Sequence, residues 1–354
     1  MVAPLNWGIG HASRCVPIID ALLAEGHHVF LASDGDAKKF LESQYPDLSV
    51  RDLPSYQITY PKAGFMFLWH MIRLVPKILK AIKKENKVLA NWIPELQLDV
   101  VISDNRYGMY SRKIKSIILT HQVRVIVPFF EAFVCSRVRQ MLSNFDDVWV
   151  PDNGGLINLS GKLGHSEVKG ITPKYTGILS RMGASLSEQK PKNFPFQAGF
   201  VLAVLSGPEP MRSYFERDLV KQFSSLNRDV VMVGGKLENQ VTVKNGNIYS
   251  MGFANSAQLK WLMQHSHGII CRSGYSTLMD LVTLRKTAII VPTPGQTEQE
   301  YLGMYLKQHP VFVVRSQKNL KVAEALVSLE KLTRNSKLDV LKNTQVLGQL
   351  IGEI

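Results

Sequence analysis

The sequence predicts an α/β protein built from two doubly wound, parallel-sheet (Rossmann-like) domains that face a cleft. Short runs of β-branched residues alternate with longer helical patterns along the whole chain, and this alternation favours parallel sheets. Some runs are continuously apolar, as in Phe200–Leu205, which suits strands buried on both faces. Between Gly154 and Pro195 the chain is richer in Gly, Ser, Pro and Lys, which indicates a boundary.

The strands are predicted from these apolar runs, beginning with a very short one within Met1–Leu5. In the first half they are His27–Ala32, Leu48–Arg51, Asp99–Ser103, Ser116–Leu119 and Asp147–Val150. In the second half they are Gly199–Leu205, Asp229–Val233, Asn247–Met251, His267–Cys271, Thr287–Val291 and Val311–Val314. We therefore expect a first domain over residues 1–155, a linker over 156–195, a second domain over 196–335 and a C-terminal helix over 336–354.

The composition is that of a globular protein large enough for two domains. The chain has 354 residues, of which 45% are hydrophobic and 20% charged, so each half can bury a core. Its three cysteines, Cys15, Cys135 and Cys271, lack metal-ligand spacing, which argues against disulfides or structural zinc and favours a reducing cytosol. The net charge of +13 indicates an anionic partner. Met1–His11 has no basic segment of a signal peptide, so a cytoplasmic location is expected.

The first glycine loop contains a candidate general base. Gly8 and Gly10 follow the first strand, and His11 then lies at the start of a helix. Imidazole is the natural general base near neutral pH. Asp104 follows another strand, and two strand ends in one parallel sheet can bring a carboxylate against a histidine and fix its tautomer. The alternatives are a structural histidine and a helix-capping aspartate.

The same loop partly matches the dinucleotide-binding fingerprint. The pattern Gly8-x-Gly10-x-x-Ser13 lacks the third glycine, but Asp34 follows the second strand where a ribose-binding acid belongs. A nicotinamide-dependent oxidoreductase is therefore the alternative enzyme class, although it leaves the polar residues of the second half unexplained.

Two turns in the second half are predicted to hold a diphosphate. Ser206-Gly207 and Ser273-Gly274 each follow an apolar strand and precede a helix. Because a helix N-terminus offers backbone N–H groups and the positive end of the helix dipole, both turns suit phosphate. Ordinary strand-to-helix turns are the alternative.

Three charged residues extend this predicted anion site. Asp280 lies about two helical turns after Ser273 and on the same side of the helix, so it can accept hydrogen bonds from ribose hydroxyls; a solvated helix charge is the alternative. Arg272 or Arg212 would stabilise the leaving diphosphate. No His, Cys or acidic cluster has convincing metal-ligand spacing, so neither a metal nor another cofactor is expected.

Together these residues resemble the inverting, metal-independent glycosyltransferases of the GT-B fold, in particular glycosyltransferase family 28, which includes the N-acetylglucosaminyltransferase of lipid II synthesis. The resemblance is carried by Cys271–Gly274, Asp280, Pro292, Gln299–Tyr301 and the Gly8–His11 loop. It implies an acceptor-side first domain and a nucleotide-sugar-binding second domain. It also implies a UDP-sugar as co-substrate.

The resemblance further implies which residues contact the donor. They are Gly8 and Gly10 in the first domain, and in the second Ser206, Gly207, Phe253, Ala254, Arg272, Ser273, Gly274, Asp280, Gln296, Glu298, Gln299 and Glu300. Phe253 or Ala254 would line the uracil pocket. The peptidoglycan enzyme has a Gln-Gln pair where this chain has Gln299-Glu300, and Trp7–Arg14 departs from its Gly-Gly-His-x-x-Pro loop, so the donor sugar and the acceptor stay open.

A basic helix is predicted from Ala63 to Asn91, broken near Pro76. A stripe of cations at helical spacing comprises Arg73, Lys77, Lys80, Lys84 and Lys87, and opposite it lie Leu68, Ile72, Val75, Leu79 and Ile82. With Phe65, Met66, Phe67 and Trp69 at its start, this helix is either a solvated surface helix or a site for an anionic membrane surface. The apolar stretch is shorter than the roughly 20 residues that span a bilayer. No nucleic-acid-binding module is present.

The sequence thus predicts an inverting, metal-independent glycosyltransferase. It would move a sugar, with N-acetylglucosamine as a candidate, from a UDP-sugar to a hydroxyl acceptor that a lipid could carry, at the inner face of the membrane. His11, oriented by Asp104, would remove the acceptor proton. A nicotinamide-dependent oxidoreductase and a non-catalytic sugar-nucleotide- or lipid-binding protein are the alternatives.

Overall fold

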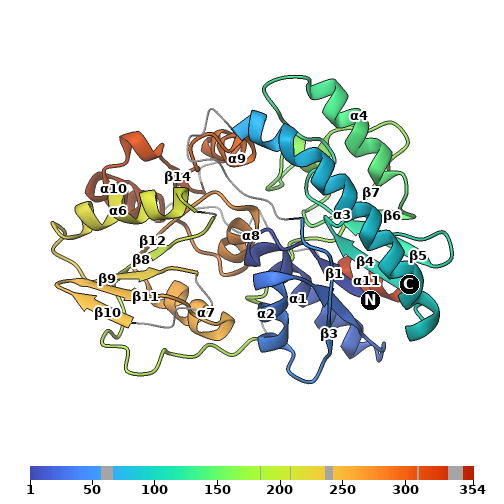
Figure 1. Ribbon diagram of the computed structural model, residues 1–354. Helices are drawn as coiled ribbons and strands as arrows, with labels where there is room; N and C mark the ends of the chain where they lie inside the picture. The colour runs from blue at the N-terminus through green and yellow to red at the C-terminus, as the bar shows by residue number, and fades with distance from the viewer. Residues whose placement is uncertain (57–66, 184, 208, 236–241, 309–310, 334–345) are drawn as a thin grey trace. The chain divides into compact units, whose positions relative to one another are not determined.

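The computed structural model describes residues 1–56, 67–183, 185–207, 209–235, 242–308, 311–333 and 346–354. The chain divides into two compact units (Figure 1). The first unit spans Met1–Thr59, Leu68–Ser180 and Asn343–Ile354, and the second spans Tyr60–Phe67 and Arg181–Lys342.

The first unit is built on a seven-stranded parallel sheet with the order β3-β2-β1-β4-β5-β6-β7. Its strands are β1 (Val2–Pro4), β2 (Leu31–Ser33), β3 (Val50–Asp52), β4 (Val100–Asp104), β5 (Lys115–Leu119), β6 (Asp147–Val150) and β7 (Pro173–Tyr175). The strand order reverses between β1 and β4, and ligands of doubly wound sheets bind at the carboxyl ends of strands at such a point. Pro4 pairs in register with Asp104, so the two strands end level with each other.

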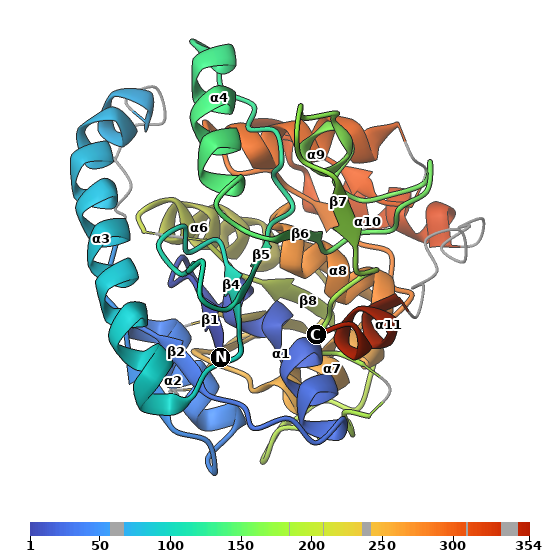
Figure 2. The ribbon, with the colours of Figure 1, turned by 90° about the vertical axis from the view of Figure 1, so that its right-hand side faces the viewer.

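The helices of the first unit are α1 (Ile9–Ala24), α2 (Gly35–Gln44), α4 (Glu131–Leu142), α5 (Lys162–His165), α11 (Val346–Gly352) and, from Leu68 onward, α3 (Phe67–Leu96). The C-terminal helix α11 packs on α1, and Figure 2 shows it in dark red beside that helix.

Helix α3 differs from its prediction in two respects. The break near Pro76 was wrong, because α3 runs through this residue. Pro76 is exposed, so water can replace the backbone donor that proline lacks. The expected apolar stripe was also partly wrong, since Val75 and Leu79 are exposed. The predicted cations whose side chains the structure describes are exposed, namely Lys77, Lys80, Lys84 and Lys87.

The second unit contains a seven-stranded sheet with the order β10-β11-β9-β8-β12-β13-β14. All neighbouring strands are parallel except β10 and β11. Its strands are β8 (Val201–Val204), β9 (Val230–Val233), β10 (Thr242–Asn245), β11 (Ile248–Met251), β12 (Gly268–Cys271), β13 (Ile289–Ile290) and β14 (Val313–Val314), and its helices are α6 (Met211–Phe223), α7 (Ser256–His265), α8 (Tyr275–Thr283), α9 (Thr297–Lys307), the short η2 (Gln317–Asn319) and α10 (Val322–Thr333).

The predicted fold class is confirmed, because both sheets are dominated by parallel strands with helical connections. Within the expected linker, however, α5 and β7 belong to the first unit, and the division between the units falls after Ser180. In the expected C-terminal helix, α11 belongs to the first unit. The strands β7 and β10 were not predicted.

Candidate functional site

His11 and Asp104 meet at the carboxyl ends of β1 and β4. Gly8 caps α1 with a φ of 78°, a backbone conformation that glycine adopts without steric cost, and His11 is then the third residue of the helix. Its Nδ1 atom lies 2.9 Å from Oδ1 of Asp104. The predicted contact between the two side chains is thus present. Gly10 precedes His11 within α1.

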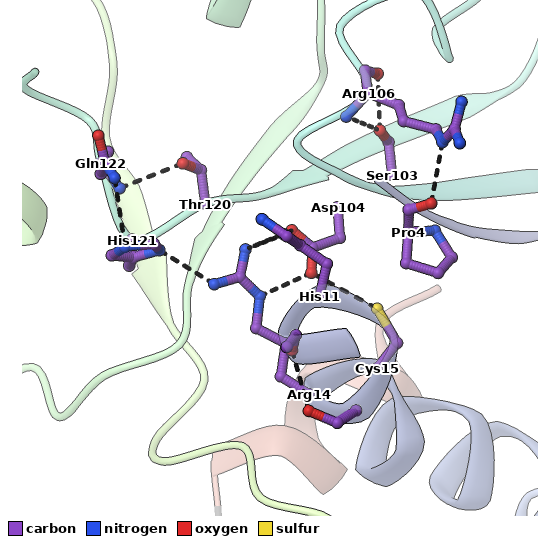
Figure 3. Close-up of polar contacts among 12 residues, drawn as sticks. Pro4, His11, Arg14, Cys15, Ser103, Asp104, Arg106, Thr120, His121 and Gln122 are labelled. Atoms are coloured by element: carbon purple, nitrogen blue, oxygen red, sulfur yellow. Dashed lines mark hydrogen bonds and ion pairs between the residues drawn. The ribbon is translucent and has the colours of Figure 1, made fainter. Parts of the chain in front are cut away.

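A third residue, Arg14, contacts the same carboxylate. It lies one helical turn after His11 and is buried. Its Nε donates to Oδ2 of Asp104 at 2.6 Å, and its Nη2 donates to Oδ1. Figure 3 shows the guanidinium between Asp104 and a second imidazole, that of His121. Nη1 of Arg14 lies 3.0 Å from Nδ1 of His121.

The surroundings of His11 favour its neutral, basic form. Burial lowers the pKa of His11, Asp104 raises it, and the positive charge of Arg14 lowers it again. For Asp104, burial alone would raise the pKa, but Arg14 and His11 hold it well below the ordinary value. The ionised Asp104 therefore accepts the Nδ1 proton of His11, and the Nε2 atom of His11 carries the lone pair that can accept a proton.

Asp34, the residue of the alternative dinucleotide reading, is engaged elsewhere in this unit. Its Oδ1 pairs with Nη2 of Arg106, and its Oδ2 accepts from Asn6 at 3.3 Å. Arg106 is buried and also pairs with Glu85, at 2.7 Å. Both oxygens of Asp34 thus have protein partners. This argues against the role of Asp34 as the ribose-binding acid of a dinucleotide site. Tyr56 donates to Glu85 and completes this buried network.

In the second unit, the first predicted phosphate turn lies between β8 and α6. Ser206 is half-buried, and Gly207 is exposed with a φ of 98°, which favours glycine. Arg212, in the first turn of α6, pairs with Glu209 and donates to the carbonyl of Gly234 at 2.6 Å. The guanidinium of Arg212 is therefore held by protein acceptors.

The second predicted turn joins β12 to α8 and is tied to the start of α9. Gly274 caps α8, and the buried Ser273 donates its hydroxyl proton to the carbonyl of Gln299 at 2.8 Å. Oε1 of Gln299 accepts from the backbone N–H and the hydroxyl of Thr293, at 3.0 and 2.8 Å. The structure thus brings Ser273 and Gln299 together, with the Ser273 proton and the Gln299 Oε1 engaged within the unit.

Asp280 lies on α8, close behind this turn. It is buried, and its Oδ2 lies 3.9 Å from Nε of Arg181. Burial lowers the pKa of Arg181, and Asp280 raises it. The carboxylate therefore lies beside a buried cation that favours its ionised form.

Arg272 lies inside the second unit, next to the second predicted phosphate turn. Its side chain is fully buried and lies over the ring of Phe215, 3.9 Å from the centroid. Nη1 donates to the carbonyls of Val291 and Pro292, and Nη2 donates to Met211 and Gln317. Both terminal nitrogens are thus used by protein acceptors inside the unit, which argues against a contact between Arg272 and the donor.

The remaining predicted residues lie in two loops. Phe253 is half-buried and Ala254 is buried, between β11 and α7. Gln296 caps α9, and its Oε1 is buried without a hydrogen-bond partner in the described part of the chain. Glu298 and Glu300 lie in the first turn of α9, and Glu300 accepts from the backbone N–H of Gly295 at 2.8 Å. In the described ranges, no group of three or more His, Cys, Asp or Glu side chains is placed to hold a metal ion.

Part of the second half of the chain is similar to a known protein family. Residues 219–346 match the family model described as the glycosyltransferase family 28 C-terminal domain. This segment is thus similar to the C-terminal domain of glycosyltransferase family 28. An uncharacterized glycosyltransferase of Methanosarcina acetivorans is 20% identical over 319 residues, which cover 83% of this chain and 79% of its own length. The predicted family resemblance and the enzyme class, glycosyltransferase, are confirmed.

Solved glycosyltransferase structures share the fold of the whole chain. The glycosyltransferase of kitacinnamycin is 15% identical with a TM-score of 0.64, and the alignment covers 99% of this chain and 97% of that chain. VinC, solved in complex with DTDP, is 12% identical with a TM-score of 0.59 over 99% and 97%. MurG of Acinetobacter baumannii is 14% identical with a TM-score of 0.53 over 100% and 98%. The GT-B fold is thereby confirmed.

Two residues of the site in the first unit were not assigned from the sequence. Arg14 lies three positions after His11, so helical spacing already placed it on the same face. His121 follows β5 by two residues, so it lies near the carboxyl end of a parallel strand, as Asp104 does at the end of β4. Both signals were present, but the contacts depend on the register of β1, β4 and β5, which a single sequence does not specify. The family 28 match covers residues 219–346 only. The cluster of His11, Asp104, Arg14 and His121 lies outside this range, so its role must be interpreted from its geometry.

Proposed function

We propose that the chain transfers a sugar from a UDP-sugar to a hydroxyl acceptor with inversion at the anomeric carbon, and that His11 is the general base. The observation that supports this is the hydrogen bond from Nδ1 of His11 to Asp104, because it leaves Nε2 unprotonated. The acceptor hydroxyl would give its proton to Nε2 as its oxygen bonds the anomeric carbon. The bond from that carbon to the diphosphate would break, and the nucleotide would leave with the electron pair.

The second unit would bind the donor. The family 28 domain match and the DTDP complex of the structurally similar VinC support a nucleoside diphosphate ligand. Gly274 at the N-terminus of α8 would approach the diphosphate, and Asp280 would hold the ribose. The buried Oε1 of Gln296 would accept a hydrogen bond from a sugar hydroxyl, since such an atom is costly to leave unsatisfied. Charge on the leaving group would be stabilised by the helix dipole, without a metal ion.

Calorimetry with nucleotides tests the donor assignment. The wild-type chain is expected to bind UDP, and Asp280→Asn is expected to weaken the binding about tenfold, because a charge-assisted hydrogen bond to a ribose hydroxyl is lost. Glu330→Gln is the matched control, since this carboxylate lies in the same unit and pairs with Arg228 and His267 on the surface. Binding of NAD in place of UDP would favour the oxidoreductase, and unchanged UDP affinity in Asp280→Asn would remove Asp280 from the site.

We also propose that the acceptor is lipid-linked, with N-acetylglucosamine as the candidate sugar, and that the first unit attaches to an anionic membrane surface. Of the residues expected to insert, Phe65 and Met66 lie outside the described residues. Three other phenylalanines at the start of α4 are strongly exposed: Phe129 by 63%, Phe130 by 79% and Phe133 by 61%. In the described residues, every helix is too short or too polar to span a bilayer.

The charges around these phenylalanines favour an anionic surface. Arg137 lies over the ring of Phe133, 5.2 Å from the centroid, and both Arg137 and Arg139 are exposed on α4. Apolar rings flanked by cations suit insertion between lipid headgroups with electrostatic attraction to acidic lipid.

Vesicle co-sedimentation tests this attachment. The protein is expected to bind vesicles of phosphatidylcholine and phosphatidylglycerol at low salt. Phe129→Ser combined with Phe130→Ser is expected to weaken binding about tenfold or more, because the variant lacks two exposed rings that would be buried in the membrane. Met304→Ser is the control, since this side chain is 64% exposed on α9 of the second unit. Equal binding to pure phosphatidylcholine vesicles would contradict the electrostatic contribution, and an unchanged double variant would contradict insertion by α4.

A further inference from the structure

The Arg14 side chain joins three other side chains of the candidate base site. Its Nε and Nη2 donate to the two oxygens of Asp104. Nη1 lies 3.0 Å from Nδ1 of His121, and Nη2 lies 3.0 Å from Nδ1 of His11. Arg14, Asp104 and His121 are all buried. The base site is therefore a cluster of four side chains from α1, β4 and the segment after β5.

Asp104 has no oxygen left for a further strong partner. Oδ1 contacts His11 and Arg14, while Oδ2 accepts from Nε of Arg14 and lies 3.7 Å from Sγ of Cys15. Burial raises the pKa of the Cys15 thiol well above its usual value, so Cys15 remains neutral. The negative charge of Asp104 is thus already neutralised by the guanidinium of Arg14. An imidazolium at His11 would therefore be stabilised less by Asp104 than it would be without Arg14.

The same contacts give the two imidazoles opposite tautomers. Arginine can only donate hydrogen bonds, so Nδ1 of His121 is an acceptor and its proton lies on Nε2. This nitrogen lies 3.4 Å from the side-chain amide of Gln122, whose oxygen accepts the proton when the amide is turned by 180°. At His11, both Nη2 of Arg14 and Oδ1 of Asp104 lie beside Nδ1. Because Nη2 already donates to Oδ1, the ionised carboxylate is the partner of Nδ1, which therefore carries the proton and leaves Nε2 bare. One guanidinium and one carboxylate thereby determine where both rings hold their protons.

We propose that Arg14 is a positioning residue that lowers the basicity of His11 and fixes the tautomer of His121. This proposal deepens the function proposed above and rests on His11 being the base. The charged and titratable groups that face His11 are Asp104 on β4, Arg14 on α1 and His121 after β5. In a simple His–Asp pair the carboxylate strongly stabilises the imidazolium. Here Arg14 offsets that stabilisation, so His11 stays neutral and able to accept a proton down to a lower pH.

The direction of the pH effect follows from these charges. Asp104 raises the pKa of His11 and Arg14 lowers it. Removal of the guanidinium charge is therefore expected to raise the pKa of His11. The acidic limb of the pH profile of kcat/KM reports the base of the free enzyme, so this limb is expected to move to higher pH in a variant without the charge.

NMR titration of the histidine side chains of the full-length protein tests the proposal without relying on activity. In Arg14→Met, the pKa of His11 is expected to rise by about one unit. In Arg14→Lys, which keeps the charge but not the two-pronged contact, it is expected to stay near the wild-type value while kcat falls. Arg51→Met is the matched control, because Arg51 forms an ion pair with Glu95 in the same unit, at 2.7 Å. An unchanged or lowered pKa of His11 in Arg14→Met would overturn the proposal.

A measurement on the wild-type protein keeps the proposal testable if Arg14→Met does not fold. The side-chain nitrogen shifts are expected to show Nδ1 of His121 without a proton and Nδ1 of His11 with one. A proton on Nδ1 of His121 would overturn the positioning role. Full activity of His11→Ala would remove the proposed function instead, and because the titration of His11 is independent of turnover, the two failures can be told apart.

Discussion

Replacing His11 with alanine is expected to lower kcat by about 10²–10⁴-fold, the usual contribution of a general base. The affinity for UDP is expected to stay unchanged, because His11 lies in the first unit and the proposed nucleotide contacts lie in the second. The fall in kcat is expected because Nε2 of His11 is the proposed proton acceptor, while its Nδ1 contacts Asp104. Sugar transfer measured in the presence of EDTA, together with calorimetry of UDP, checks this prediction.

His28→Ala is the control for this variant, because His28 is an exposed histidine of the same unit whose ring packs against Phe30. Full turnover of His11→Ala would remove the residue from the base role. If the wild-type protein binds UDP but transfers no sugar to any acceptor extract, the non-catalytic alternative is favoured, and the pairing of His11 with Asp104 is then structural.

The sequence was informative where strand ends and helical spacing determine position. The polar residues at the carboxyl ends of β1 and β4 were expected to meet, and His11 and Asp104 do so because Pro4 and Asp104 are in register. Asp280 was expected in the helix that follows Ser273, about two turns along it. It does lie in α8, the helix that Gly274 caps. Such positions depend mainly on local periodicity, which one sequence contains.

Other features depend on contacts that the sequence does not encode locally. The three-residue strand β7 has half-buried side chains and gives no apolar run. Proline usually argues against a continuous helix, but the exposed side of α3 accommodates Pro76. The network of Arg106, Glu85 and Asp34 joins residues from three distant parts of the chain, so neither composition nor spacing indicated it.

Arg272 shows how one motif can mislead about an individual residue. In the segment Cys271–Gly274 the arginine stands next to the predicted phosphate turn, which suggested an anion contact. In a strand, however, successive side chains point to opposite faces of the sheet, and Arg272 directly follows β12. Its guanidinium turns toward α6 and the loop after β13, where carbonyl groups accept its protons. Burial lowers its pKa to about 10, which Asp218 partly offsets, so it remains a cation near neutral pH.

Replacing Arg272 with methionine is therefore expected to destabilise the protein by about 3 kcal/mol, because buried carbonyl acceptors lose their donors. UDP affinity of the folded variant is expected to stay within about twofold of wild type, because the guanidinium is held by protein acceptors and would give no hydrogen bond to the nucleotide. Loss of a hydrogen bond to UDP would change the affinity by more than this. Arg315→Met is the control, because Arg315 is a partly exposed arginine at the end of β14 that donates to Val314 and Ser328. Denaturant unfolding and UDP calorimetry separate the two effects: a loss of UDP affinity without a loss of stability would restore Arg272 to the diphosphate site.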